Sequence, residues 1–178
     1  YKRQIQQLNE RWVAGDSDVA KASFHAGLLL AERMWVLPSG SALGFGVGPL
    51  LLSSQAGEEP CDASQLTLCP GEHTTASLLF SLFYPLSTRV KQVVFSEIMP
   101  KLQRLEANFG VCIHEGRFTW QQQGLFLVED LGTRWERETQ SPLPLGGILA
   151  AKSLGSDVLS RVQQTIRDSL QFALDDPQ

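Results

Sequence analysis

The sequence predicts an α/β protein with two lobes and a central cleft. Short apolar runs of strand length alternate with amphipathic helical stretches along the chain, which is typical of α/β folds. Polar or proline-rich stretches at 53–63 and near Pro142 are typical of connections between lobes. We therefore expect a first lobe from 1–53 and the returning segment 142–178, and a second lobe from 54–141. Clefts between two lobes are preferred ligand sites.

The first part of the chain begins with a helix. Residues 3–14 carry apolar side chains at helical spacing, and the following Gly-Asp-Ser ends that helix. A strand end is expected at 18–20, followed by an apolar helix over 21–30. The run Met-Trp-Val-Leu at 34–37 is expected to be a strand, closed by a turn with proline and glycine.

Three glycines at positions 44, 46 and 48 precede Pro49 and an expected strand at 50–52. A phosphate-binding glycine loop follows a strand and opens a helix. Because a proline and a strand follow here, these glycines do not predict a dinucleotide site. They indicate close backbone packing or a hinge.

The middle of the chain alternates regularly. Strands are expected at 66–69, 90–95 and 110–113 because each is a short apolar run, and the helices at 77–84 and 96–106 show apolar residues at helical spacing. The final part repeats the alternation, with strands at 125–128 and 145–151 and helices at 130–138 and 156–174.

Thr74 and Thr75 stand at the start of the helix expected at 77–84, after a strand and a Pro-Gly turn. The first N–H groups of a helix lack partners within the helix and point beyond its end, which suits an anion. An ordinary threonine cap explains the same residues equally well.

The strand at 110–113 is followed by His-Glu-Gly-Arg, from His114 to Arg117. In open α/β sheets, ligands bind beyond the carboxyl ends of the strands. An imidazole titrates near neutral pH and is a natural general base. The alternative is an ordinary surface turn.

Composition excludes several classes of function. The net charge is -4 and the 15 basic residues are scattered, so no nucleic-acid surface is expected. No apolar run reaches membrane-spanning length. The cysteines at 61, 69 and 112 lack zinc-site spacing, so we expect no metal and a reduced, cytoplasmic protein.

Several motifs occur together in one order: 18–26 (DVAKASFHA), 40–50 (GSALGFGVGPL), 70–76 (PGEHTTA), 113–120 (IHEGRFTW) and 142–147 (PLPLGG). As a set they resemble the 1,4-dihydroxy-6-naphthoate synthases of the futalosine route to menaquinone. The resemblance covers nearly the whole chain. It implies the fold of type 2 periplasmic binding proteins, used as a cytoplasmic enzyme.

The resemblance implies a cofactor-free lyase that converts cyclic dehypoxanthinylfutalosine to 1,4-dihydroxy-6-naphthoate. His114 matches the family's base, and Thr75 and Ala76 match the residues that hold the substrate carboxylate. Ser23 and Asn9 match residues expected to line the cleft. Arg117 is added on chemical grounds, because a guanidinium can bind a carboxylate with two hydrogen bonds.

Family members also begin with a strand and a Ser-Pro-Cys-Pro-Asn-Asp loop that this chain lacks, and they continue beyond Gln178. Weak or absent activity is therefore expected for residues 1–178 alone, and turnover equal to that of a full-length version would refute this expectation. The sequence leaves the oligomeric state open, with a homodimer as one option.

Two alternatives remain. One is chorismate dehydratase, of the same pathway and fold; the other is a non-catalytic protein of this fold that binds a small carboxylate. Replacing His114 with alanine separates an enzyme from a binding protein, because only the enzyme needs the base.

Overall fold

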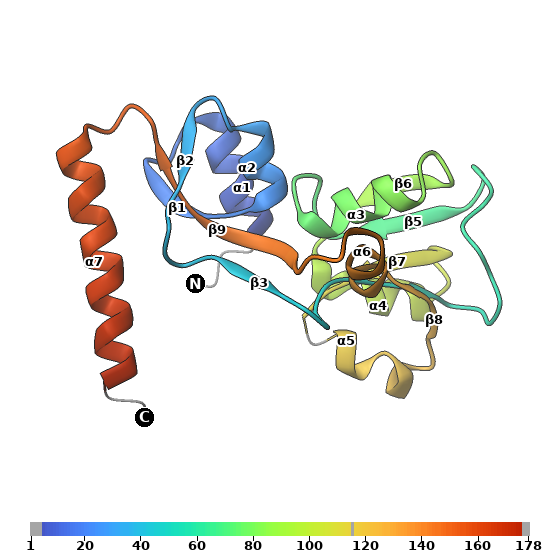
Figure 1. Ribbon diagram of the computed structural model, residues 1–178. Coiled ribbons are helices and arrows are strands. Elements are labelled where there is room, and N and C mark those ends of the chain that lie inside the picture. Colours follow the sequence, from blue (N-terminus) through green and yellow to red (C-terminus); the bar gives the residue numbers. More distant parts are fainter. Residues whose placement is uncertain (1–4, 115, 176–178) are drawn as a thin grey trace. The chain divides into compact units, whose positions relative to one another are not determined.

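The computed structural model describes residues 5–114 and 116–175, which divide into two compact units. Unit 1 comprises 1–42 and 145–178, and unit 2 comprises 43–144 (Figure 1). The first division thus falls at Ala42, whereas the sequence suggested residue 53. The polar stretch 53–63 lies inside unit 2, where it connects two strands of one sheet.

The sheet of unit 1 is centred on the long strand β9 (Leu143–Ala151), which belongs to this unit from Leu145 onward. β9 pairs in antiparallel fashion with β1 (Val19–Ser23) and with β2 (Met34–Val36), and the short β3 (Ala42–Gly44) pairs with β9 as well. Two helices, α1 (Ile5–Ala14) and α2 (Phe24–Leu29), pack on this sheet through a core of Trp12, Ala22, Ala26, Leu30 and Leu149.

The expected helix at 21–30 was wrong over its first three residues. Lys21 to Ser23 belong to β1, paired with Ile148 to Gly146 of β9. A Cβ on Gly146 would lie 2.5 Å from the Ala22 carbonyl oxygen, so this glycine lets the two strands approach closely. Pairing with β9 therefore overrides the local helical spacing.

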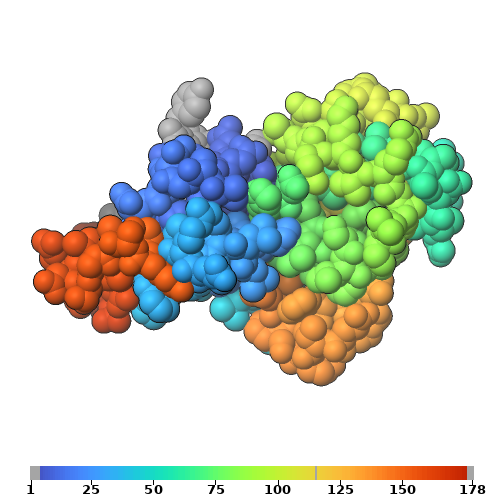
Figure 2. All heavy atoms as spheres, turned by 90° about the horizontal axis from the view of Figure 1, so that it is seen from above, coloured from blue at the N-terminus to red at the C-terminus, as the bar shows by residue number. Residues whose placement is uncertain are grey.

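The last helix, α7 (Ser156–Asp175), has no buried residue. Its Val158, Val162 and Ile166 face a cavity of about 620 Å³ that Val19 and Ile148 also line. Figure 2 shows α7 in orange-red, apart from blue α1 of the same unit. Among the described residues, no helix has both the length and the apolarity needed to span a membrane.

Unit 2 contains a five-stranded sheet in the order β6-β5-β7-β4-β8. Its strands are β4 (Leu50–Ser53), β5 (Leu66–Cys69), β6 (Arg89–Gln92), β7 (Phe109–Cys112) and β8 (Phe126–Asp130). β5 is parallel to β6 and β7, whereas β4 is antiparallel to β7 and β8. The sheet is therefore mixed, with three parallel strands on one side.

Helices follow the strands of unit 2: α3 (Thr75–Phe83), α4 (Phe95–Gln103), α5 (Gly116–Thr119), a 3-10 turn (Gln121–Gln123) and α6 (Leu131–Thr139). α4 packs on β7 at Gly110, where a Cβ would lie 2.4 Å from Ile98. α3 and α6 lie side by side, as the green and orange segments of Figure 2 show. The core between α4 and the sheet includes Leu50, Leu52, Leu68, Ile98 and Leu102.

Candidate functional site

The carboxyl ends of three parallel strands meet at one edge of the unit 2 sheet. β5, β6 and β7 all end there because they run in the same direction. Leu50, which opens β4, pairs with Cys112 of β7 and with Asp130 of β8. The start of β4 and the end of β8 therefore lie at this edge too. In open α/β sheets this is the edge where ligands bind.

The start of α3 is held by a set of hydroxyl and backbone contacts at this edge. The Thr74 hydroxyl donates to the Gly71 carbonyl at 2.7 Å and accepts from the Ser77 N–H at 3.2 Å. The Ser77 hydroxyl also donates to Gly71, at 2.6 Å, and the Gln92 side chain at the end of β6 accepts from the Gly71 N–H at 3.0 Å. These hydrogen bonds hold the first turn of α3 to Gly71, and Gly71 is held in turn by the end of β6.

Thr75 and Ala76 are the first two residues of α3, and both are buried. Thr74 is the N-cap, so the capping role considered for Thr75 belongs to its neighbour. N–H groups in the first helical turn, including that of Ala76, point out of the helix end. A carboxylate placed there would face both these groups and the positive end of the helix dipole.

His114 lies two residues beyond the end of β7 at the same edge. Its side chain is exposed, and its ring makes an edge-to-face contact with Phe95, with 5.4 Å between the ring centroids. Its backbone has φ of +54°, the left-handed region that few non-glycine residues adopt. The Gly116 N–H donates to the Ile113 carbonyl at 3.2 Å, so His114 sits within a tight turn. Glu115 of this motif lies outside the described residues.

Arg117 makes two contacts through its guanidinium. It donates to the Asp130 carboxylate at 2.6 Å and to the Gly48 carbonyl at 3.2 Å. Burial alone would raise the pKa of Asp130, but the hydrogen bonds from Arg117 and from the Thr133 N–H hold it below its usual value. The expected contact of Arg117 with a substrate carboxylate stays a prediction. In the structure the guanidinium donates to two protein acceptors, Asp130 and Gly48.

The lowered pKa of Asp130 makes a testable contribution to stability. Its ionised form is favoured in the folded state, so the contribution is present above the unfolded pKa of about 4 and is lost as pH falls through the folded pKa. We expect Asp130→Asn to lower the unfolding free energy at pH 7 and to have a much smaller effect near pH 3. Asparagine keeps one oxygen that can cap α6, and it removes the charge together with the second oxygen that accepts from Arg117. Urea titrations at both pH values measure this; an equal loss at both would contradict it.

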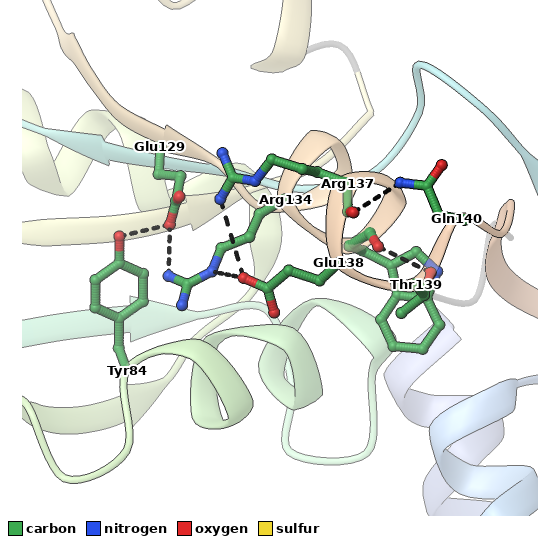
Figure 3. Close-up of polar contacts among 8 residues, drawn as sticks. Tyr84, Glu129, Arg134, Arg137, Glu138, Thr139 and Gln140 are labelled. Atoms are coloured by element: carbon green, nitrogen blue, oxygen red, sulfur yellow. Dashed lines mark hydrogen bonds and ion pairs between the residues drawn. The ribbon is translucent and has the colours of Figure 1, made fainter.

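A second polar cluster in unit 2 surrounds Arg134 of α6 (Figure 3). Its guanidinium donates to Glu129 at 3.1 Å and to Glu138 at 2.8 Å, and lies over the Phe83 ring at 4.3 Å. The Tyr84 hydroxyl donates to Glu129 at 2.7 Å. This cluster joins α6 to α3 and β8.

Asn9 and Ser23 belong to unit 1 and are buried together. The Asn9 amide donates to the Ser23 hydroxyl at 3.0 Å and its carbonyl accepts from the Ser23 N–H at 3.0 Å. Ser23 also caps α2 by accepting from the Ala26 N–H. The pair therefore joins α1 to the turn between β1 and α2. Direct contact of either residue with substrate stays a prediction.

Replacing Asn9 with alanine is expected to lower the unfolding free energy by about 1–3 kcal/mol, because the buried Ser23 N–H loses its acceptor. Asn9→Asp keeps an acceptor at that position, although a charge there carries its own burial cost. Gln6→Ala, which removes an exposed hydrogen bond to Glu10 of the same helix, should change stability by less than about 0.5 kcal/mol. Equal losses for Asn9→Ala and Gln6→Ala in thermal unfolding would show that the buried pair is unimportant.

Two features bear on metal and thiol chemistry in the described part of the chain. Among residues 5–114 and 116–175, no group of three His, Cys, Asp or Glu side chains is arranged to hold a metal ion. Burial raises the pKa of the Cys69 and Cys112 thiols to about 12, so both are protonated at neutral pH.

Three residues at the sheet edge were not anticipated as part of the site: Phe95, Gln92 and Asp130. Phe95 contacts His114, Gln92 holds Gly71, and Asp130 binds Arg117. Gln92 and Asp130 are the last residues of β6 and β8, and Phe95 begins α4 three residues after β6 ends. Each of these residues follows an apolar run, which was a sign in the sequence that it could lie at a strand end. The order of the strands in the sheet, which the sequence does not show, brings the three residues to one edge.

Comparisons with known proteins agree with one another. A family model described as Menaquinone biosynthesis matches residues 1–178. A Streptomyces coelicolor protein named 1,4-dihydroxy-6-naphthoate synthase is 38% identical over 169 residues, which are 92% of this chain and 59% of the relative. A Thermus thermophilus protein of the same name is 37% identical over 180 residues, 98% of this chain and 63% of the relative. The chain thus spans about three fifths of each relative's length.

Solved structures agree with the fold. A crystal structure of an Archaeoglobus fulgidus protein matches with a TM-score of 0.87 and 30% identity, over 98% of this chain and 65% of that one. The alkanesulfonate-binding protein SsuA from Xanthomonas axonopodis pv. citri, bound to MOPS, matches with a TM-score of 0.66 and 10% identity, over 96% and 58%. The expected α/β fold of the periplasmic-binding-protein type is confirmed.

Proposed function

The chain belongs to the menaquinone biosynthesis family, and on that premise we propose that it acts as a 1,4-dihydroxy-6-naphthoate synthase, a lyase that uses cyclic dehypoxanthinylfutalosine. The observation that carries the proposal is the identity of 37–38% to two proteins of that name, over 92–98% of this chain. The arrangement at the unit 2 sheet edge also supports it, because His114 and the first turn of α3, the proposed base and the proposed anion site, lie at one edge.

His114 is the proposed general base. Its imidazole is exposed, lies beyond the end of β7, and makes an edge-to-face contact with the ring of Phe95. In the proposed step the imidazole takes a proton from the substrate. The electron pair left behind forms a π bond as a carbon–carbon bond of the substrate breaks. The electrons of the broken bond stay with one of the two products, 1,4-dihydroxy-6-naphthoate or the ribose-derived fragment, and that product takes the proton back from the imidazolium.

The first turn of α3 is the proposed site for the substrate carboxylate, with Thr75 and Ala76 as its residues. The contacts of Thr74 and Ser77 with Gly71 hold this turn in place before substrate arrives. Preorganised N–H donors bind an anion without the cost of ordering them during the reaction. For Asn9 and Ser23 we propose a role in binding the substrate, as the family resemblance implies.

The remaining expectations follow from this function. The substrate is a small carboxylate, and no cofactor takes part in the proposed reaction. A cytoplasmic location fits three cysteines that are all free thiols. A homodimer is proposed as the assembly, which a sedimentation experiment tests directly.

The test is incubation of the protein with cyclic dehypoxanthinylfutalosine while the naphthoate chromophore is followed. Residues 1–178 and the complete translation product of the gene are both assayed, because the curated relatives are longer than this chain. Chromophore formation by either supports the proposal. Formation of product from chorismate instead would identify a chorismate dehydratase, and tight binding of the carboxylate without turnover by both forms would identify a binding protein.

A further inference from the structure

We propose that Arg117 is a positioning residue rather than the substrate ligand expected from its chemistry: together with Asp130 and Gly48 it holds the turn that places His114 for proton transfer. This inference rests on the proposed role of His114 as base. It concerns how unit 2 keeps that base in place.

The guanidinium joins three segments that are distant in the sequence. One nitrogen, Nη2, donates to Asp130 at the end of β8, at 2.6 Å, and the other, Nη1, donates to the carbonyl of Gly48 before β4, at 3.2 Å. The backbone N–H of Arg117 donates to the His114 carbonyl at 3.1 Å. A shift of Arg117 therefore acts directly on the backbone of His114.

The turn needs such support. His114 has φ of +54°, and the left-handed region costs a non-glycine residue roughly 1–2 kcal/mol. The following helix, α5, has only four residues, and so short a helix has little stability of its own. Contacts from outside must therefore hold the conformation, and on the imidazole side the ring of Phe95 packs against the His114 ring.

The two acceptors of Arg117 are themselves fixed. Asp130 caps α6 by accepting from the Thr133 N–H at 3.0 Å. The Leu131 N–H donates to the Pro49 carbonyl at 3.1 Å, which ties the Gly48 segment to the start of the same helix. A guanidinium suits this pair because it presents several donors in one rigid plane. A lysine ammonium is a single point charge and would not reproduce both contacts in that geometry.

The Arg134 cluster supplies a matched control within unit 2. The Arg117 and Asp130 side chains are 19% and 21% exposed, and those of Arg134 and Glu129 are 25% and 24% exposed. Both arginines bind a carboxylate at or near the end of β8. Only Arg117 also bonds to the His114 turn, so the two substitutions differ mainly in that connection.

The experiment compares Arg117→Met, Arg117→Lys and Arg134→Met in the protein form that turns over cyclic dehypoxanthinylfutalosine. We expect Arg117→Met to lower kcat by about tenfold to a hundredfold, the scale of a misplaced catalytic group, with KM within about twofold of wild type. Arg117→Lys should recover part of kcat. Arg134→Met should keep kcat and KM near wild type.

A second measurement does not depend on activity. The chain has three histidines, so histidine-labelled protein gives few imidazole signals in NMR spectra. The Phe95 ring should shift the His114 ring signals, and Arg117→Met should remove that shift, whereas Arg134→Met should retain it. Arg117→Lys keeps the positive charge beside Asp130 and should fold even if Arg117→Met does not. Its His114 ring signals then still report on the conformation of the turn.

Three results would overturn the inference. A raised KM with unchanged kcat in Arg117→Met would mean that Arg117 binds substrate. Equal changes in the Arg117→Met and Arg134→Met proteins would mean a general effect on stability. If the His114 ring signals kept their wild-type chemical shifts in both Arg117 variants, the turn would keep its conformation without Arg117. Wild-type turnover by a His114 variant would instead refute the proposed base, and the NMR comparison would still decide the role of Arg117.

Discussion

Replacing His114 with asparagine is expected to lower the turnover of cyclic dehypoxanthinylfutalosine by about a hundredfold to ten thousandfold, while substrate binding stays near that of wild type. Asparagine is the appropriate replacement because it tolerates the left-handed backbone that His114 adopts, with φ of +54°. The variant therefore removes the base while keeping the turn. His114→Ala removes the same base but adds backbone strain, so it should lose stability as well.

The effect of His114→Asn is measured in two ways: kcat is obtained from naphthoate formation, and substrate affinity is obtained from calorimetry. His25→Asn is the control, because that histidine lies in α2 of unit 1, remote in sequence from the sheet edge of unit 2. It should keep kcat within about threefold of wild type. If His114→Asn retained wild-type turnover, another group would be the base; if it lost affinity to the same degree as kcat, His114 would serve in binding instead.

Much of the fold could be predicted because it depends on local patterns. The strand at 66–69 and the long helix near 156–174 are continuous, strongly patterned segments, and both are confirmed. The position of His114 just after a strand also followed from an apolar run that ends in polar residues. That position is confirmed, whereas its role as base is the proposal tested above.

The remainder depends on contacts that no local pattern contains. Lys21 to Ser23 form a strand because β9, more than a hundred residues later in the chain, pairs with them. Arg117 reads as a free guanidinium in the sequence, and its partners Asp130 and Gly48 come from the ends of two other strands. The antiparallel insertion of β4 beside β7 is what brings Gly48 to this edge, and the order of strands in a sheet cannot be read from their sequences.

Replacing Gly132 with alanine is expected to destabilise unit 2 by about 3 kcal/mol, the upper part of the range for overpacked sites. A Cβ on Gly132 would lie 2.0 Å from the Val47 carbonyl oxygen and 3.1 Å from its carbonyl carbon. Both are backbone atoms and cannot rotate away, so either α6 or the 47–49 segment must move. Thermal unfolding should show a midpoint lower by roughly 6–12 °C.

Gly27→Ala is the matched control, because Gly27 also lies in a helix but its Cβ would make only ordinary contacts with Leu149, at 3.8 Å. Alanine is the better helix former, so this variant should be neutral or slightly stabilising. An unchanged midpoint in Gly132→Ala would mean that the 47–49 segment yields easily. That result would also weaken the proposed role of Arg117. The close approach of Gly132 to the 47–49 segment is what keeps the two acceptors of Arg117, Gly48 and Asp130, near each other. Gly132→Ala should accordingly lower kcat even at temperatures where the protein stays folded, since both acceptors of Arg117 would shift relative to the His114 turn.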